Sequence, residues 1–233
     1  MRTRSREPQT LGSDGTLERM ARILAARNID PAAVTSVEEP EPAPLDALLT
    51  RIPSRYQGAV ADHPKALAWV REVAEAAVAP GIGARRQVAT GPSLLMAGVV
   101  GAGKTWQAYG AIRRLVQEGI GVRWRATTAA DLYAELRPGS DTDSERVLAS
   151  YSRVPLLILD DLGAARSTEF VEEQTYRLIN RRYNHELPTL VTTNLRIGDL
   201  RAHLGDRVAS RLSQMTERVE FEPVDRRRQR RAA

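Results

Sequence analysis

Hydrophobic and polar positions divide the chain into short apolar runs that alternate with amphipathic segments. Apolar runs of strand length occur at 94–98, 120–126, 154–160, 187–193 and 219–221. Segments with helical periodicity occur at 64–78, 104–118, 129–136, 170–184 and 207–215. This alternation predicts an α/β fold, a three-layer arrangement with a mainly parallel five-stranded sheet. Because 154–160 is uniformly apolar, we expect it to be a central strand with both faces covered.

The helix predicted over 64–78 illustrates how the pattern assigns a buried face. Leu67, Val70, Ala74 and Val78 follow helical spacing, and Pro64 suits the first turn. Glycines within 80–92 indicate a loop, and residues 138–145 are polar and turn-rich.

The first 45 residues have a different pattern. A short helix is predicted over 16–27, and the acidic, proline-rich stretch 37–44 indicates a semi-rigid spacer. We therefore expect three parts: an N-terminal extension with linker over 1–45, one domain over 46–223 and a basic tail over 224–233. The extension is interpreted either as a docking element or as an unstructured leader.

Composition narrows the class of protein. The 233 residues contain no cysteine, which excludes disulfides, thiol chemistry and cysteine-based zinc sites. No apolar run approaches the length of a membrane span, and residues 1–30 lack an apolar signal core, so we expect a cytoplasmic protein. The net charge of +5 is concentrated in the arginines of 226–231. This tail either binds nucleic acid phosphates or is a solvated end.

A phosphate-loop motif carries the most specific chemistry. The motif G-x-x-x-x-G-K-[ST] is matched from Gly98 to Thr105, between a predicted strand and a predicted helix. Its glycines allow successive N–H groups to surround a phosphate, and the helix adds its positive end. Lys104 is expected to reach the β- and γ-phosphates, and Thr105 to hold Mg²⁺.

Two further strand ends carry polar groups suited to the same site. Asp160 and Asp161 end one apolar run, and Asn194 ends the next. Because the carboxyl ends of parallel strands meet at one edge, Asp160 is expected to bind Mg²⁺ and Asp161 to orient or deprotonate water. Asn194 is expected to contact the γ-phosphate or that water. Acids at strand ends are common, however, and Asn194 is also compatible with a simple turn.

Two arginines four residues apart form the last element. Arg207 and Arg211 lie on one face of the predicted helix over 207–215. Their position suits an arginine finger that reaches the γ-phosphate of a neighbouring subunit. A solvated basic face is the alternative.

The four elements together resemble the AAA+ ATPases, and more narrowly the DnaC-type helicase loaders and IstB-type transposition helper ATPases. The resemblance covers about residues 50–225. It is carried by Gly103-Lys104-Thr105, Leu159-Asp160-Asp161-Leu162-Gly163, Val191-Thr192-Thr193-Asn194 and Ser210-Arg211-Leu212. The stretch from Ile52 to Tyr56 resembles the segment that flanks the adenine in this family.

The resemblance implies an ATPase with ATP and Mg²⁺ as ligands. Thr105 and Asp160 would hold Mg²⁺, Asp161 would replace the usual catalytic glutamate, Asn194 would be the polar sensor, and Arg211 would be the finger with Arg207 as companion. The nucleotide-binding set would be Gly98, Gly101, Ala102, Gly103, Lys104, Thr105, Trp106, Ile52 and Tyr56.

The resemblance also implies partners. Family members assemble with ATP between subunits, bind single-stranded DNA and engage a replicative helicase through an N-terminal segment, whose place residues 1–50 occupy. Tyr133 and Arg137 lie where the family inserts a DNA-contacting helix. Only 22 residues follow Arg211, so no C-terminal lid domain is expected.

Three functions are compatible with these features. The first is a loader of a replicative helicase, which the proline-spaced leader favours. The second is a transposition helper that binds DNA and recruits a transposase, which the basic tail favours. The third is a small phosphate-loop kinase, in which Asn194 and the late arginines would have no role.

Overall fold

The computed structural model describes residues 25–26, 45–137, 139 and 143–224. The chain divides into two units, Met1–Glu41 and Pro42–Ala233. The expected division into three parts stays a prediction. The helix expected over 16–27, apart from residues 25–26, lies outside the described residues, as do the spacer over 37–44 and the arginines of the tail. No described helix combines the length and apolar character that a membrane crossing needs.

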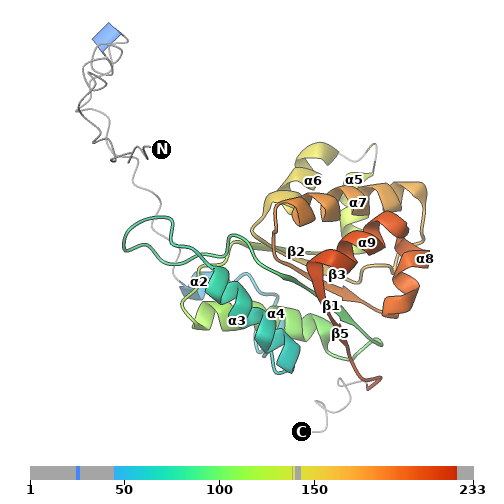
Figure 1. The fold of residues 1–233 in the computed structure, drawn as a ribbon, viewed down its shortest axis with the longest axis horizontal. Coiled ribbons are helices and arrows are strands. Elements are labelled where there is room, and N and C mark those ends of the chain that lie inside the picture. Colours follow the sequence, from blue (N-terminus) through green and yellow to red (C-terminus); the bar gives the residue numbers. More distant parts are fainter. Residues whose placement is uncertain (1–24, 27–44, 138, 140–142, 225–233) are drawn as a thin grey trace, which may run out of the picture. The chain divides into compact units, whose positions relative to one another are not determined.

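The larger unit is built on a five-stranded parallel sheet (Figure 1). Its strands are β1 (Ser93–Ala97), β2 (Trp124–Thr128), β3 (Leu156–Asp160), β4 (Thr189–Thr193) and β5 (Thr216–Glu220), in the order β2-β3-β4-β1-β5. Each neighbouring pair is parallel, with Leu95 of β1 opposite Val191 of β4 and Arg218 of β5. The predicted fold class is confirmed.

Helices cover both faces of the sheet, which explains the apolar central strands. One face packs against α2 (Leu45–Leu49), α3 (Pro64–Ala76), α4 (Lys104–Gln117) and a 3₁₀ turn, Ser54–Tyr56. The other packs against α5 (Ala129–Leu136), α6 (Ser144–Arg153), α7 (Glu169–Asn184), α8 (Leu200–Leu204), α9 (Asp206–Met215) and a 3₁₀ turn, Ile197–Asp199. Leu94 and Met96 point into the first core and Leu95 into the second, as a strand requires.

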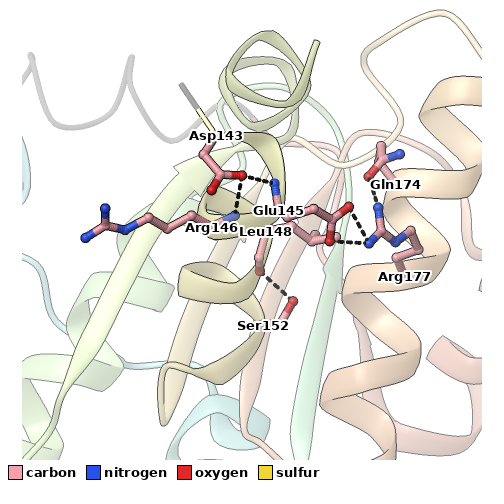
Figure 2. Close-up of polar contacts among 7 residues, drawn as sticks. All are labelled: Asp143, Glu145, Arg146, Leu148, Ser152, Gln174 and Arg177. Atoms are coloured by element: carbon pink, nitrogen blue, oxygen red, sulfur yellow. Dashed lines mark hydrogen bonds and ion pairs between the residues drawn. The ribbon is translucent and has the colours of Figure 1, made fainter. Parts of the chain in front are cut away.

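Helix α6 was not predicted from the sequence. Asp143 caps it, because its carboxylate accepts hydrogen bonds from the N–H groups of Glu145 and Arg146 at 3.1 and 3.2 Å. Figure 2 shows that the Glu145 carboxylate then pairs with Arg177 of α7, with Nη2–O distances of 2.7 and 2.6 Å. This pair lowers the pKa of the Glu145 carboxyl.

Two other expectations need correction. The strand expected over 120–126 begins at Trp124, because Gly121 bonds instead to the loop before β1, through Arg86 O and Val88 N. The helix expected over 64–78 ends at Ala76, and Val78 is 55% exposed. Its most buried face runs through Ala66, Trp69, Val70 and Val73, so of the predicted set only Val70 is fully buried.

A buried arginine ties helix α7 to the amino ends of two strands. Arg182 is 0% exposed, and its guanidinium donates to the carbonyls of Tyr151 (2.9 Å), Val154 (2.8 Å) and Pro188 (2.8 Å). Its Nε donates to Thr189 Oγ1 at 2.7 Å. Burial lowers the pKa of Arg182 to about 9, so the group remains cationic at neutral pH.

Candidate functional site

The phosphate loop connects β1 to α4 and takes backbone conformations that favour glycine. Gly98, Gly101 and Gly103 have φ angles of 153°, 86° and 96°. A Cβ on Gly98 would also lie 2.9 Å from the Cβ of Phe221, which follows β5. The loop's own geometry therefore favours glycine at the three motif positions.

The side chain of Lys104 is held by hydrogen bonds to the loop and to Asn194 at the end of β4. Its side chain is 5% exposed, and Nζ donates to Gly98 O at 2.8 Å, Val99 O at 2.9 Å and Asn194 Oδ1 at 2.9 Å. A buried ammonium needs such acceptors. The phosphate-loop lysine and the end of β4 thus meet, as the sequence predicts.

Thr105 and Asp160, which are predicted to hold Mg²⁺, lie within hydrogen-bonding distance of each other. Thr105 Oγ1 donates to the two carboxylate oxygens at 3.0 and 3.2 Å, and Thr192 Oγ1 donates to Oδ1. Burial raises the pKa of Asp160 and so does the charge of Asp161, while the bonds from Thr192 and Thr105 lower it. A hydroxyl beside one carboxylate fits Mg²⁺, which takes few protein ligands and completes its shell with phosphates and water. No group of three or more histidine or acidic side chains suited to a metal occurs among the described residues.

Asp161 is oriented by its backbone and by Asn194. Its φ of 54° is in the left-handed region, which aspartate tolerates better than most residues. Its N–H donates to Thr192 Oγ1 at 3.0 Å, and its Oδ1 accepts from Asn194 Nδ2 at 3.1 Å. The second carboxylate therefore turns away from Asp160 toward Asn194 and, through Asn194, toward Lys104.

Thr192 and Thr193 belong to the strand end that the sequence analysis quotes, but the sequence assigned no role to either of them. Thr192 bridges Asp160 and the N–H of Asp161, while Thr193 Oγ1 donates to Leu162 O at 2.7 Å and Thr193 O accepts from Gly98 N at 3.2 Å. Together they join the ends of β3, β4 and β1. The available signal was the pair of hydroxyl residues directly before Asn194.

An aromatic group borders the phosphate loop on the α4 side. The rings of Tyr56 and Tyr109 stack at 4.8 Å, and Tyr56 meets Trp106 edge-on at 6.5 Å. Ile52 is buried in the adjacent core. Burial, with the charge of Asp160 and the nearby Tyr56, raises the pKa of Tyr109 to about 12. Ile52 and Tyr56, which are predicted to flank the adenine, thus lie beside helix α4, and Trp106 of the predicted nucleotide-binding set lies in its first turn.

Gln107 and Gly110 of α4 contact residues 60–63, the segment that precedes α3. Gln107 Oε1 accepts from the N–H groups of Asp62 and His63 at 3.0 and 3.1 Å. A Cβ on Gly110 would lie 2.3 Å from Ala61 N and from Val60 C, so only glycine allows this approach. Neither residue was predicted from the sequence, since both act through a segment distant along the chain.

The predicted arginine pair lies on α9 and contacts α7. The guanidinium of Arg207 lies over the ring of Tyr176, and that of Arg211 over the ring of Tyr183. Arg211 Nε also donates to Asn180 Oδ1 at 3.1 Å. The structure therefore does not bring these arginines into the polar network around Lys104 of the same chain.

Of the two expected DNA contacts, Tyr133 is buried and Arg137 is exposed. Tyr133 is 5% exposed, and its hydroxyl shares a 2.7 Å hydrogen bond with Thr175 of α7, so it belongs to the core between α5 and α7. Burial raises the pKa of Tyr133. Arg137, at the end of α5, is exposed, and its contact with DNA stays a prediction.

The fold and the network define a phosphate-loop nucleotide-binding protein of the AAA+ type. Residues 85–230 match a family model described as IstB-like ATP binding protein. This match covers more than half of the chain, which therefore belongs to the family of IstB-like ATP binding proteins. The resemblance inferred from the motifs is confirmed, as is the predicted ATP binding.

Among individual proteins, the chain is similar to a replicative helicase loader. The replicative helicase loader DnaC of Escherichia coli (strain K12) is 27% identical over 123 residues, which are 52% of this chain and 49% of that protein. The chain thus spans about half the length of the curated relatives it matches. The crystal structure of the DnaC helicase loader has a TM-score of 0.60 at 26% identity, covering 73% of this chain and 100% of that one.

More distant structures share the fold alone. The crystal structure of DnaI has a TM-score of 0.57 at 22% identity, over 68% of this chain and 84% of that one. A replication initiator DnaA bound to AMPPCP and single-stranded DNA has a TM-score of 0.56 at 20% identity, over 75% and 52%.

Proposed function

We propose that this chain hydrolyses ATP and loads a replicative, DnaB-type helicase onto single-stranded DNA. The observation that carries the proposal is one connected polar network, in which Lys104, Asn194 and Asp161 form one branch and Thr105 and Asp160 the other. Similarity to a replicative helicase loader supports the choice of partner.

The network suits the hydrolysis of a γ-phosphoryl group. Lys104 and the loop N–H groups would bind the β- and γ-phosphates, while Asp161 would orient the attacking water with Asn194 beside it. Mg²⁺, held by Thr105 and Asp160, supplies charge neutralisation at the phosphates when it is bound. Arg211 would act on the nucleotide of a neighbouring subunit, so Arg211→Ala should lower turnover about 10³-fold and leave ATP binding intact.

The proposal includes three interactions. ATP lies between subunits of an assembly, single-stranded DNA contacts the surface near Arg137, and the N-terminal unit engages the helicase. ATP drives such a switch only through its different affinity for the free and assembled states. Within residues 1–50, we take 1–41 as the docking segment, because Leu48 and Leu49 pack against the core of the larger unit.

A transposition helper is the second candidate function. The family model that matches residues 85–230 is described as IstB-like, and this observation favours it. In that case the protein would bind duplex DNA and recruit a transposase, with the arginines of 226–231 contacting phosphates.

The deciding experiment measures the mass of complexes by light scattering after size exclusion. The chain is mixed with the replicative helicase of the same organism, with and without ATP and Mg²⁺. We expect a stoichiometric complex that is lost when residues 1–41 are removed and retained when residues 225–233 are removed. Lys104→Ala serves as the control that cannot bind ATP. Absence of a complex in every nucleotide state would reject the loader and favour the transposition helper.

A further inference from the structure

Both arginines of α9 lie on aromatic rings of a single neighbouring helix. The guanidinium carbon of Arg207 is 3.8 Å from the ring centroid of Tyr176, and that of Arg211 is 4.5 Å from the ring centroid of Tyr183. Two helical turns separate the tyrosines on α7, so they share a face and form parallel supports for the arginines.

Hydrogen bonds fix the orientation of Arg211 on its ring. Nε donates to Asn180 Oδ1 at 3.1 Å and Nη1 to Gln214 Oε1 at 3.5 Å. The hydroxyl of Tyr183 donates to the same Gln214 oxygen at 2.8 Å. The guanidinium is therefore held from one face by the ring and along its edge by two amide oxygens.

Helix α7 is itself fastened to its surroundings. Figure 2 shows the pair between Arg177 and Glu145 that joins it to α6. Thr175 is bonded to Tyr133 of α5, and Arg182 is buried among strand-end carbonyls. The tyrosines thus stand on a helix that cannot shift without breaking buried contacts.

The two arginines differ in their electrostatic surroundings. Arg207 is exposed at a cavity of about 360 Å³ whose lining includes the carboxylates of Glu169, Glu172, Glu173 and Asp206. These carboxylates would repel a triphosphate. Arg211 is half-buried, and its hydrogen bonds are to neutral amides. Arg211 is accordingly the better phosphate ligand of the pair.

We propose that Tyr183, with Asn180, is a positioning residue that holds Arg211 ready for the nucleotide of a neighbouring subunit, and that Tyr176 supports Arg207 as its companion. The inference rests on the proposed hydrolysis with a finger supplied in trans. A free arginine loses much rotamer freedom when it is fixed, and a side chain already held on a ring loses less at the moment of reaction.

The test compares Tyr183→Leu with Tyr183→Phe in the full chain. Loss of a surface cation–π contact corresponds to about a two- to five-fold effect, so Tyr183→Leu should lower turnover at saturating ATP by this factor. Tyr183→Phe keeps the ring and should retain parental turnover. The Kd of a fluorescent ATP analogue and the thermal midpoint are measured alongside, and the Kd should be equal in all three proteins.

Two further arms separate positioning from simple loss of structure. In an Arg211→Ala background, Tyr183→Leu should cause no additional loss of turnover. In mixtures of the Tyr183→Leu and Lys104→Ala proteins, turnover per Tyr183→Leu subunit should be restored. The Lys104→Ala protein supplies an intact Arg211 in trans to the sites that still bind ATP.

The outcomes separate the two proposals. Unchanged turnover in Tyr183→Leu, or an equal loss in the Arg211→Ala background, overturns the positioning role while leaving hydrolysis established. If the parent protein hydrolyses no ATP in any assembly, the proposed function fails, and the positioning role fails with it.

Discussion

The ammonium of Lys104 and the side-chain amide of Asn194 are joined by a hydrogen bond of 2.9 Å between Nζ and Oδ1. The amide nitrogen of the same residue donates to Asp161 Oδ1 at 3.1 Å. A single amide therefore connects the cation of the phosphate loop with the carboxylate proposed to orient water. An amide suits this role, since one end accepts and the other donates.

Asn194→Asp should bind ATP and lose hydrolysis. A carboxylate keeps an acceptor for Lys104 but cannot donate to Asp161, so the second contact becomes a repulsion. We expect turnover to fall by about 10²-fold, the usual effect of removing one polar group that acts in the transition state. Phosphate release and the Kd of a fluorescent ATP analogue measure the two effects, with Asn194→Ala as the matched variant. Parental turnover in Asn194→Asp would show that the Lys104 contact alone matters.

Asp160→Asn should retain the stability of the nucleotide-free protein but lose the stabilisation that depends on Mg²⁺. Since burial and Asp161 raise the pKa of Asp160, its charge disfavours the folded state, and the neutral amide should leave the nucleotide-free protein as stable or more stable. At 100-fold excess over Kd, MgATP should stabilise the parent by about 2.7 kcal/mol. The variant should lose the Mg²⁺-dependent part of this gain. Thermal unfolding with ATP, with and without Mg²⁺, measures both, and an equal Mg²⁺ effect in the two proteins would contradict the assignment.

Tyr109 should be the source of a late ionisation step. Burial raises its pKa from 10.0 to about 12, so between these values the unfolded chain releases a proton that the folded chain retains. The contribution of Tyr109 to the free energy of unfolding is therefore lost as the pH rises through this window. Ultraviolet titration of tyrosinate should show a step near pH 12 in the parent that is absent in Tyr109→Phe.

Arg182→Met should be strongly destabilising. The substitution removes the donor from the carbonyls of Tyr151 and Val154 and from the Thr189 hydroxyl, which corresponds to about 3 kcal/mol or more in the free energy of unfolding. Pro188 O keeps its bond from Leu157 N. Urea denaturation measures the difference. Arg114→Met is the control, because Arg114 forms an exposed helical pair with Glu118 and should cost about 0.5 kcal/mol or less. Equal losses in the free energy of unfolding for Arg182→Met and Arg114→Met would contradict the structural role of Arg182.

Gly110→Ala should detach the segment around residues 60–63 from α4. The added methyl would lie 2.3 Å from backbone atoms of Val60 and Ala61, and such overpacking costs about 1–3 kcal/mol. Gly198→Ala is a matched control, since a Cβ there meets no atom within 4 Å. Hydrogen exchange should show faster exchange of the Asp62 and His63 amides in Gly110→Ala alone.

The centre of the site could be predicted because its chemistry lies in contiguous motifs. The loop from Gly98 to Thr105 needs no distant information, and the rule that parallel strands end at one edge brings Asp160, Asp161 and Asn194 to it. Each of these placements follows from a strand identified by its apolar run. The prediction therefore succeeded where a local pattern and a fold rule agree.

The remaining features depend on contacts between segments far apart in the sequence. Tyr133 has the spacing of either a surface or a core residue, and its partner Thr175 decides the matter. Arg182 resembles any arginine near a helix end until the carbonyls around it are known. The start of α6 did have a local signal, the capping residue Asp143, which the polar composition of 138–145 obscured.

The pairing of β1 with β5 sets the order in which the protein can be completed during synthesis. Ser93 pairs with Thr216, and Phe221 lies against Gly98 at the start of the phosphate loop. The chain is made from its N-terminus, so the loop is translated long before the strand that supports it. A nascent chain released too early lacks this support. The phosphate loop therefore gains its contact with Phe221 only after β5 has been translated.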